Sequence, residues 1–271
     1  MAKYNKKRAR ELQHDKFRDT AGRVFDRLAD RLEGRGREIL YVLGGIILVA
    51  ILVGVWLKWS HRKSDEAQRA MGRAIAIATA PVATASPAPG APAPVYNTEQ
   101  DRARKAAEEF QKVAAKYGDP YKIEARYLMG ANMLYFDREK AMNELAEVSK
   151  SSVPEAATLA KLALAQAKEA DGKFDDAAKL YSELASQNST IVTAETANVH
   201  LADVYEKQGK RKEAAEILFN IVEASRKLKD SDGEPIQPTG AARDAGEKLQ
   251  KLDPERYAKL TPQTPNPDSP F

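Results

Sequence analysis

An eighteen-residue phrase occurs twice in the C-terminal half of the chain. Residues 164–181 read LAQAKEADGKFDDAAKLY, and residues 201–218, thirty-seven positions later, read LADVYEKQGKRKEAAEIL. Seven of the eighteen positions are identical, including Leu-Ala at the start, Gly-Lys in the middle and Ala-Ala near the end. Such repetition indicates a repeat protein, because a single unit cannot bury its apolar face unless neighbouring units stack on it.

Each copy predicts a helix, a tight turn and a second helix. Apolar residues recur at helical spacing on both sides of Gly172 and of Gly209. Glycine ends helices by adopting a left-handed conformation, so both glycines are expected in the turns. Small residues at matching positions would let the two helices of each hairpin approach closely; they are Ala165, Ala177, Ala202 and Ala214.

The phrase resembles the tetratricopeptide repeat (TPR), a unit of about 34 residues that forms a helix-turn-helix. Leu201-Ala202-xx-Tyr205, followed by Gly209-Lys210 and Ala214, is the best copy. A weaker copy begins at Leu128-Met129-Gly130 and continues with Ala141 after a turn at Asp137-Arg138. The anchor alanines 141, 177 and 214 are 36 and 37 residues apart, slightly above the usual period.

An incomplete repeat precedes these three. Residues 99–117 look like a lone second helix. Its partner is expected within residues 58–80, where Ala67, Ala70, Ala74 and Ile77 are spaced to pack on one helical face. The Ala/Pro-rich stretch PVATASPAPGAPAP at 81–94 would then be an enlarged turn between the two helices.

A run of nineteen residues without a charge, ILYVLGGIILVAILVGVWL, occupies positions 39–57. As a helix it would be roughly 28 Å long, close to the ~30 Å hydrocarbon core of a bilayer. Tyr41, Trp56 and Trp59 stand at its ends, where interfacial aromatic residues belong. A buried helix of a soluble protein rarely stays uncharged for so long. A cleaved signal peptide is disfavoured by the long preceding segment. We expect an uncleaved signal anchor.

Charge is distributed unevenly around this run. Residues 1–38 contain twelve Lys/Arg against seven Asp/Glu, whereas the remaining 233 residues contain 31 against 32. The basic excess predicts a cytoplasmic N-terminus and argues against a nucleic-acid-binding body. Residues 20–37 have an amphipathic helical pattern, which would either rest on anionic lipid or remain a solvated arm.

The expected architecture is all-α, with a single N-terminal transmembrane helix followed by a short TPR helical solenoid. Its segments are a basic cytoplasmic arm with an amphipathic helix (1–38), the transmembrane helix (39–57), a juxtamembrane helix (58–80), an Ala/Pro-rich linker (81–97), a TPR-like domain (98–260) and a Pro-rich tail that is disordered by composition (261–271).

No pattern in the sequence is typical of an active site. The three histidines, His14, His61 and His200, fall in the arm, at the membrane edge and in a repeat helix. The chain has no cysteine, no phosphate-binding glycine loop and no HExxH motif. We therefore expect no enzymatic activity, no cofactor, no metal and no small-molecule substrate.

The complete layout resembles the YfgM-like family of bacterial inner-membrane proteins, which are ancillary to the Sec translocon. The resemblance covers residues 10–225. It implies a periplasmic repeat domain that binds translocon components, a periplasmic chaperone or exported clients. The Ala/Pro insertion and the C-terminal tail depart from the family pattern. A coordinator of envelope assembly or cell division, and a structural subunit of a larger membrane complex, stay open as alternatives.

Protein-binding residues are expected on the first helix of each repeat, which usually lines the concave face of a TPR stack. The mixture of acidic and apolar groups there would suit an extended or helical peptide of basic character. Changing Asp203 and Glu206 together to Lys is expected to weaken partner capture and leave helical content unchanged. By the repeat register the candidates are Glu124, Tyr127, Ala131, Leu134, Leu162, Gln166, Glu169, Val199, Asp203 and Glu206.

Overall fold

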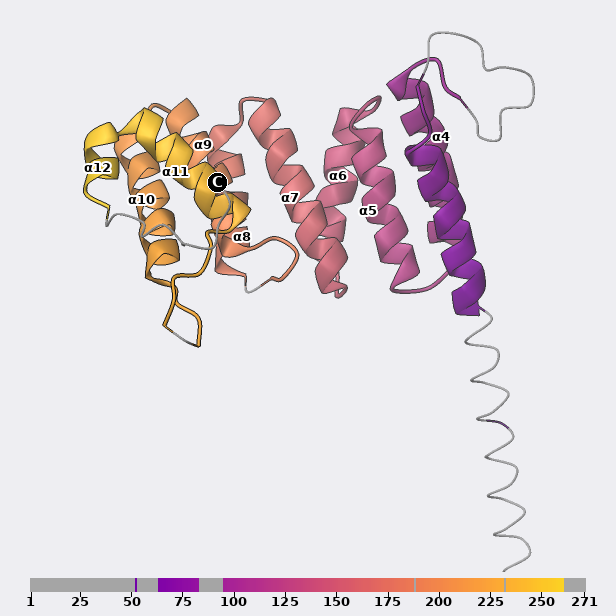
Figure 1. The fold of residues 1–271 in the computed structure, drawn as a ribbon. Coiled ribbons are helices and arrows are strands. Elements are labelled where there is room, and N and C mark those ends of the chain that lie inside the picture. Colours follow the sequence, from indigo (N-terminus) through magenta and orange to yellow (C-terminus); the bar gives the residue numbers. More distant parts are fainter. Residues whose placement is uncertain (1–51, 53–62, 83–94, 188, 232, 261–271) are drawn as a thin grey trace, which may run out of the picture. The chain divides into compact units, whose positions relative to one another are not determined.

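The computed structural model describes residues 52, 63–82, 95–187, 189–231 and 233–260 (Figure 1). The chain divides into two compact units, residues 1–64 and 65–271, and the helices below lie in the second or begin at its border. The predicted arm (1–38), span (39–57, apart from Leu52), most of the linker (83–94) and the tail (261–271) fall outside the described residues. Within the described ranges, no helix has the length and apolar character that crossing a bilayer requires.

The described part of the chain is all-α, with two isolated β-bridges. Residues 63–78 are helical, and the helices that follow form antiparallel neighbours joined by short connections (Figure 1). They are α4 (Glu99–Lys116), α5 (Tyr121–Met133), α6 (Arg138–Val148), α7 (Pro154–Ala170), α8 (Phe174–Ser186), α9 (Ala194–Lys207), α10 (Arg211–Lys227), α11 (Gly240–Leu252) and α12 (Pro254–Ala258).

The turns inside the two best repeats have the predicted geometry. Gly172 and Gly209 have φ angles of 72° and 76°. After each glycine, a lysine N–H donates to a carbonyl five residues back, over 2.9 Å: Lys173 to Lys168, and Lys210 to Tyr205. These bonds close the same Schellman motif in both copies, so the two hairpins turn in the same way.

Three helices begin at a threonine that caps the free N–H groups of the first turn. The hydroxyl oxygens of Thr98, Thr193 and Thr239 accept from the backbone N–H three residues further on, over 3.0, 3.2 and 3.1 Å. Each cap satisfies a donor that has no partner inside the helix. The starts of α4, α9 and α11 are therefore encoded locally.

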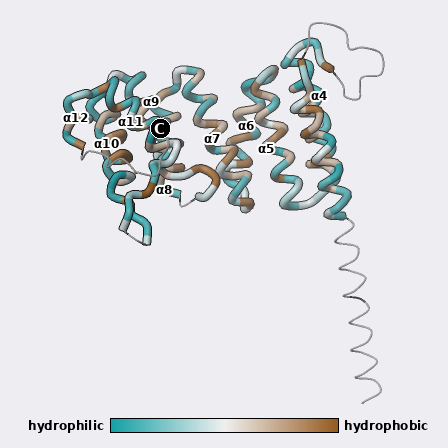
Figure 2. Tube along the Cα trace, viewed as in Figure 1, coloured by the Kyte–Doolittle hydropathy of each residue, from teal (hydrophilic) through white to brown (hydrophobic). Residues whose placement is uncertain are grey.

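Four buried clusters follow one another along the stack, each shared by consecutive helices. In Figure 2 hydrophilic and hydrophobic residues alternate along each helix, as expected for helices with one buried face. Ala141, Ala177 and Ala214 each have no exposed surface. Ala165 and Ala202 are equally enclosed, which confirms that the small residues mark the contact between the paired helices.

The first repeat differs from the other two by one residue at its turn. α5 ends five residues before α6 begins, whereas α7 ends four residues before α8. In this repeat Gly130 lies against α6, and a Cβ there would lie 3.1 Å from Leu145 Cγ. Leu128 and Met129 instead pack against the cluster that contains Met71.

Residues 63–78 pack against α4, although residues 83–94 separate them in the sequence. Met71 and Ala74 share a buried cluster with Ala106, Phe110 and Val113 of α4. The backbone N–H of residue 96 donates to the carbonyl of residue 81 over 3.2 Å, which joins the two ends of the intervening segment. This is the pairing expected from the sequence for residues 58–80 and 99–117.

Polar contacts between neighbouring repeats recur with the same spacing. Arg138, at the start of α6, pairs with Asp171 at the end of α7, with 2.6 Å between Nε and Oδ1. Gln208, at the end of α9, donates to Asp175 in the first turn of α8 over 2.8 Å. Both pairs are 33 residues apart and lie beside the turns, so they hold successive hairpins in register.

Candidate functional site

The ten predicted binding residues come from three helices, as the repeat register requires. Three lie on α5, three on α7 and three on α9, and Leu134 follows α5 directly. Gln166 and Glu206 are exposed, and Val199 is buried with 5% of its surface accessible. The other seven are half-buried: Glu124, Tyr127, Ala131, Leu134, Leu162, Glu169 and Asp203.

Glu169 is the centre of a polar cluster that joins α7, α8 and α9. Lys207 pairs with its Oε1 at 2.6 Å, and the hydroxyl of Tyr181 donates to its Oε2 over 2.8 Å. Burial alone would raise the pKa of Glu169. The hydrogen bonds from Lys207 and Tyr181 outweigh that effect and hold the pKa below its usual range. The negative charge of the carboxylate is therefore balanced by Lys207, and both of its oxygens accept hydrogen bonds within the chain.

Tyr181 connects this cluster to the core. Its side chain has no exposed surface, and burial together with the hydrogen bond to Glu169 raises the pKa of its hydroxyl. The ring of His200 stacks on that of Tyr181, with centroids 5.2 Å apart and an interplanar angle of 12°. His200 of α9 thus packs against Tyr181 of α8.

Asp203 is also engaged inside the chain, by a lysine that the sequence analysis did not select. Lys248 of α11 pairs with Asp203 at 2.6 Å and lies 4.0 Å from Asp244. Burial opposes the charged form of Lys248, but the hydrogen bond to Asp203 outweighs it and raises the pKa of the ammonium group. The pair fixes α11 to the face of α9 on which Asp203 lies.

α11 covers the C-terminal end of the predicted groove. Val199 belongs to the same buried cluster as Ala242, Ala245 and Leu249 of α11. Val199 is therefore buried among residues of α10 and α11 and is not accessible to a partner. The 3,4 spacing of these α11 residues is that of a packing helix. That spacing is visible in the sequence, but it does not show which face of α9 the helix covers.

The part of the face contributed by α5 and α7 has a different character. Tyr127 and Leu134 flank one buried cluster and Leu162 flanks the next, so each leaves part of its apolar surface accessible. Gln166 is exposed on the helix that also carries Leu162. This part of the face combines apolar groups with the Gln166 amide and two acids, Glu124 of α5 and Glu169 of α7, of which Glu169 is paired with Lys207.

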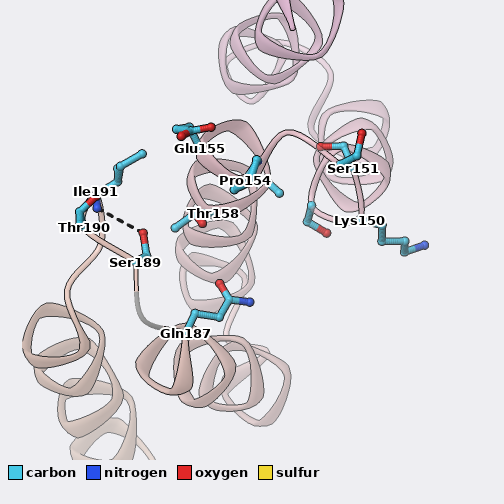
Figure 3. Close-up of a pocket in the computed structure, with 12 residues that line it drawn as sticks. Lys150, Ser151, Pro154, Glu155, Thr158, Gln187, Ser189, Thr190 and Ile191 are labelled. Carbon is cyan, nitrogen blue, oxygen red and sulfur yellow. Dashed lines mark hydrogen bonds between the residues drawn. The ribbon is translucent and has the colours of Figure 1, made fainter. Parts of the chain in front are cut away.

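An open hollow of about 700 Å³ lies elsewhere, between the α6–α7 and α8–α9 connections (Figure 3). Hydroxyl groups are common in its lining, which includes Ser151, Thr158, Ser189 and Thr190, but none of the ten predicted residues lines it. The dashed line in Figure 3 marks the backbone N–H of Ile191 donating to Ser189 Oγ over 3.2 Å. The Ser189 hydroxyl is thus used within its own loop. Because none of the predicted residues lines the hollow, it is a separate feature from the predicted binding face.

Comparison with known proteins gives a structural likeness of low identity. No family model matches the chain, and no curated protein matches it. A solved structure from Podosopora anserina, described as kinesin light chain nearly identical TPR-like repeats, aligns with 17% identity and a TM-score of 0.45. The alignment covers 57% of this chain and 79% of that one. The helix pairs described above make the chain a TPR-like helical repeat protein.

Proposed function

We propose that this chain is a membrane-anchored scaffold that binds proteins through its repeat stack. The observation that carries the proposal is the accessible apolar surface shared by α5 and α7, beside two acids, Glu169 and Asp203, that already have partners within the chain. A repeat stack offers such a surface to an extended or helical segment of a partner. The bound segment is expected to be mainly apolar, because Glu169 and Asp203, two of the four acids on the face, are already paired with lysines of the chain.

The proposed cellular role is accessory to protein secretion and folding at the translocon, on the periplasmic side of a bacterial inner membrane. It is supported by the predicted span at 39–57, the basic segment before it and the layout of the repeats. In this role the partners are translocon components, a periplasmic chaperone or exported clients.

Photo-crosslinking from Gln166 tests the proposal, with Asn143 as the matched control. Both are exposed amides, but Gln166 lies on a first helix and Asn143 on α6, the second helix of its hairpin. A photoreactive residue at position 166 of the full chain, in intact membranes, is expected to crosslink to translocon or chaperone components. The same residue at 143 is expected not to. Equal labelling from both positions, or none from 166, would contradict the proposal.

A further inference from the structure

Four connections lie at one edge of the repeat stack, which we call the loop edge. They follow α4, α6, α8 and α10, and include residues 117–120, 149–153, 189–193, 228–231 and 233–239. Because successive helices alternate in direction, the helix over 63–78 also begins at this edge (Figure 1). The chain therefore enters the stack at the loop edge.

Three large apolar side chains are exposed on the loop edge. Ile191 is 44% exposed, Leu228 is 49% exposed and Ile236 is 45% exposed. Leu228 and Ile236 are neighbours across a small hairpin, where the N–H of Ile236 donates to the carbonyl of Leu228 over 3.1 Å. These residues are held in position by backbone contacts but leave much of their own surface in water.

The opposite edge of the same repeats is polar. Its turns, residues 171–173 and 208–210, read Asp-Gly-Lys and Gln-Gly-Lys. Tyr135, in the α5–α6 turn, is an exposed aromatic residue on that edge, and it is 54% exposed. Among the described residues from α8 to α12, the exposed large hydrophobic side chains are therefore Ile191, Leu228 and Ile236, all on the loop edge.

The tether to the predicted span is short. Residues 58–62 separate the apolar run from residue 63, where the described part of the first helix begins. Five residues reach at most about 18 Å when fully extended. This step rests on the proposed function. If residues 39–57 anchor the chain in a bilayer, the loop edge is the edge that the chain brings to the lipid surface.

We infer that the loop edge is a membrane-contacting surface, and that Ile191, Leu228 and Ile236 insert into the interfacial region of the bilayer. Tethering raises the effective concentration of the domain at the lipid, so weak apolar contacts suffice to dock it. Charges along the edge are of both signs: Lys150 lies in the connection after α6, and Lys229, Asp230 and Glu234 lie in the connection after α10. Docking therefore depends on apolar insertion rather than on anionic lipid.

The absence of cysteine in the full chain allows single labels to test the inference. Ile191→Cys, Leu228→Cys and Ile236→Cys variants, with Tyr135→Cys as the exposed control, carry an environment-sensitive fluorophore. The full chain is reconstituted into neutral phosphatidylcholine vesicles that contain a lipid-bound nitroxide quencher. Quenching at the three loop-edge positions is expected to exceed that at position 135 by about twofold or more, because interfacial side chains lie within the headgroup–acyl boundary. Helical circular dichroism checks that each labelled variant is folded.

Vesicle flotation separates the two hypotheses. A chain that floats and is quenched only at the loop edge supports the inference. A chain that floats, with equal quenching at all four positions, overturns the membrane-contacting edge and leaves the anchor intact. A chain that fails to float overturns both the anchor and this edge, whereas protein capture at Gln166 is measured independently.

Discussion

Asp203 of α9 and Lys248 of α11 form an ion pair, with 2.6 Å between the carboxylate oxygen and the ammonium nitrogen. The pair joins the first helix of the last repeat to the helix that closes the stack. It lies beside the cluster in which Val199 packs against Ala242 and Ala245. Asp203 therefore holds α11 in place and is not a free ligand for a basic peptide.

Replacing Asp203 by Lys is expected to destabilise the C-terminal end of the stack. The change removes an ion pair that is partly shielded from water and places two ammonium groups together. A partly exposed pair contributes about 1 kcal/mol at most, and the new repulsion adds to the loss, so we expect about 1–2 kcal/mol in total. Urea unfolding of the full chain in detergent, followed by circular dichroism, measures the change.

The matched control is Glu206→Lys, one turn further along α9 and exposed. It is expected to change the free energy of unfolding by less than about 0.5 kcal/mol. The exchanged pair Asp203→Lys with Lys248→Asp should recover part of the loss. No recovery would show that the ion pair does not hold α11. The structure thus alters the expectation that Asp203 and Glu206 could be changed together without a structural effect.

Glu169 is expected to make stability depend on pH in the acidic range. Its pKa in the folded chain lies below the reference value of 4.5. Its contribution is therefore fully present above about pH 4.5 and is lost as the pH falls through the folded pKa. The difference in unfolding free energy between the wild type and Glu169→Gln should shrink across that window. A difference that stays constant from neutral pH down to pH 3 would contradict the role of this carboxylate.

The hairpins could be predicted because their signals are local. Gly172 and Gly209 end helices through their own backbone conformation, and Ala177 and Ala214 mark where paired helices touch. The partner of Asp203 could not be predicted in this way. It lies 45 residues further along the chain, and its identity depends on the angle at which α11 crosses α9. The ionic character of the candidate face is thus a tertiary property.

The contact at Gly130 is a tertiary property too. The sequence offers Leu128-Met129-Gly130 as a motif, but the packing of α5 against α6 decides which of the three lies against α6. Gly130 is the one that faces Leu145, whereas Leu128 and Met129 pack against the cluster that contains Met71.

Two helix-interior glycines are expected to respond to alanine in opposite directions. At Gly72 a Cβ would meet no atom within 4 Å, so Gly72→Ala should stabilise the chain by about 0.5–1 kcal/mol through helix propensity. At Gly130 the Cβ would lie 3.1 Å from Leu145 Cγ, and Leu145 is fully buried. Overpacking costs about 1–3 kcal/mol, so Gly130→Ala should be destabilising. Thermal unfolding of both variants gives the signs, and a stabilising Gly130→Ala would show that α5 and α6 can move apart at no cost.

A single exposed substitution should separate partner binding from stability. Gln166→Arg places a charge among the accessible apolar groups of α5 and α7, where an apolar partner segment would have to desolvate it. Because Gln166 is exposed, the free energy of unfolding should change by less than about 0.5 kcal/mol. Capture of the crosslinked partner in mild detergent should fall about tenfold, which corresponds to about 1.4 kcal/mol of binding free energy. Asn143→Arg adds the same charge to α6 and should leave capture unchanged. Equal loss of capture in both variants would show that net charge causes the effect. Full capture by Gln166→Arg would show that the binding face does not include this part of α7.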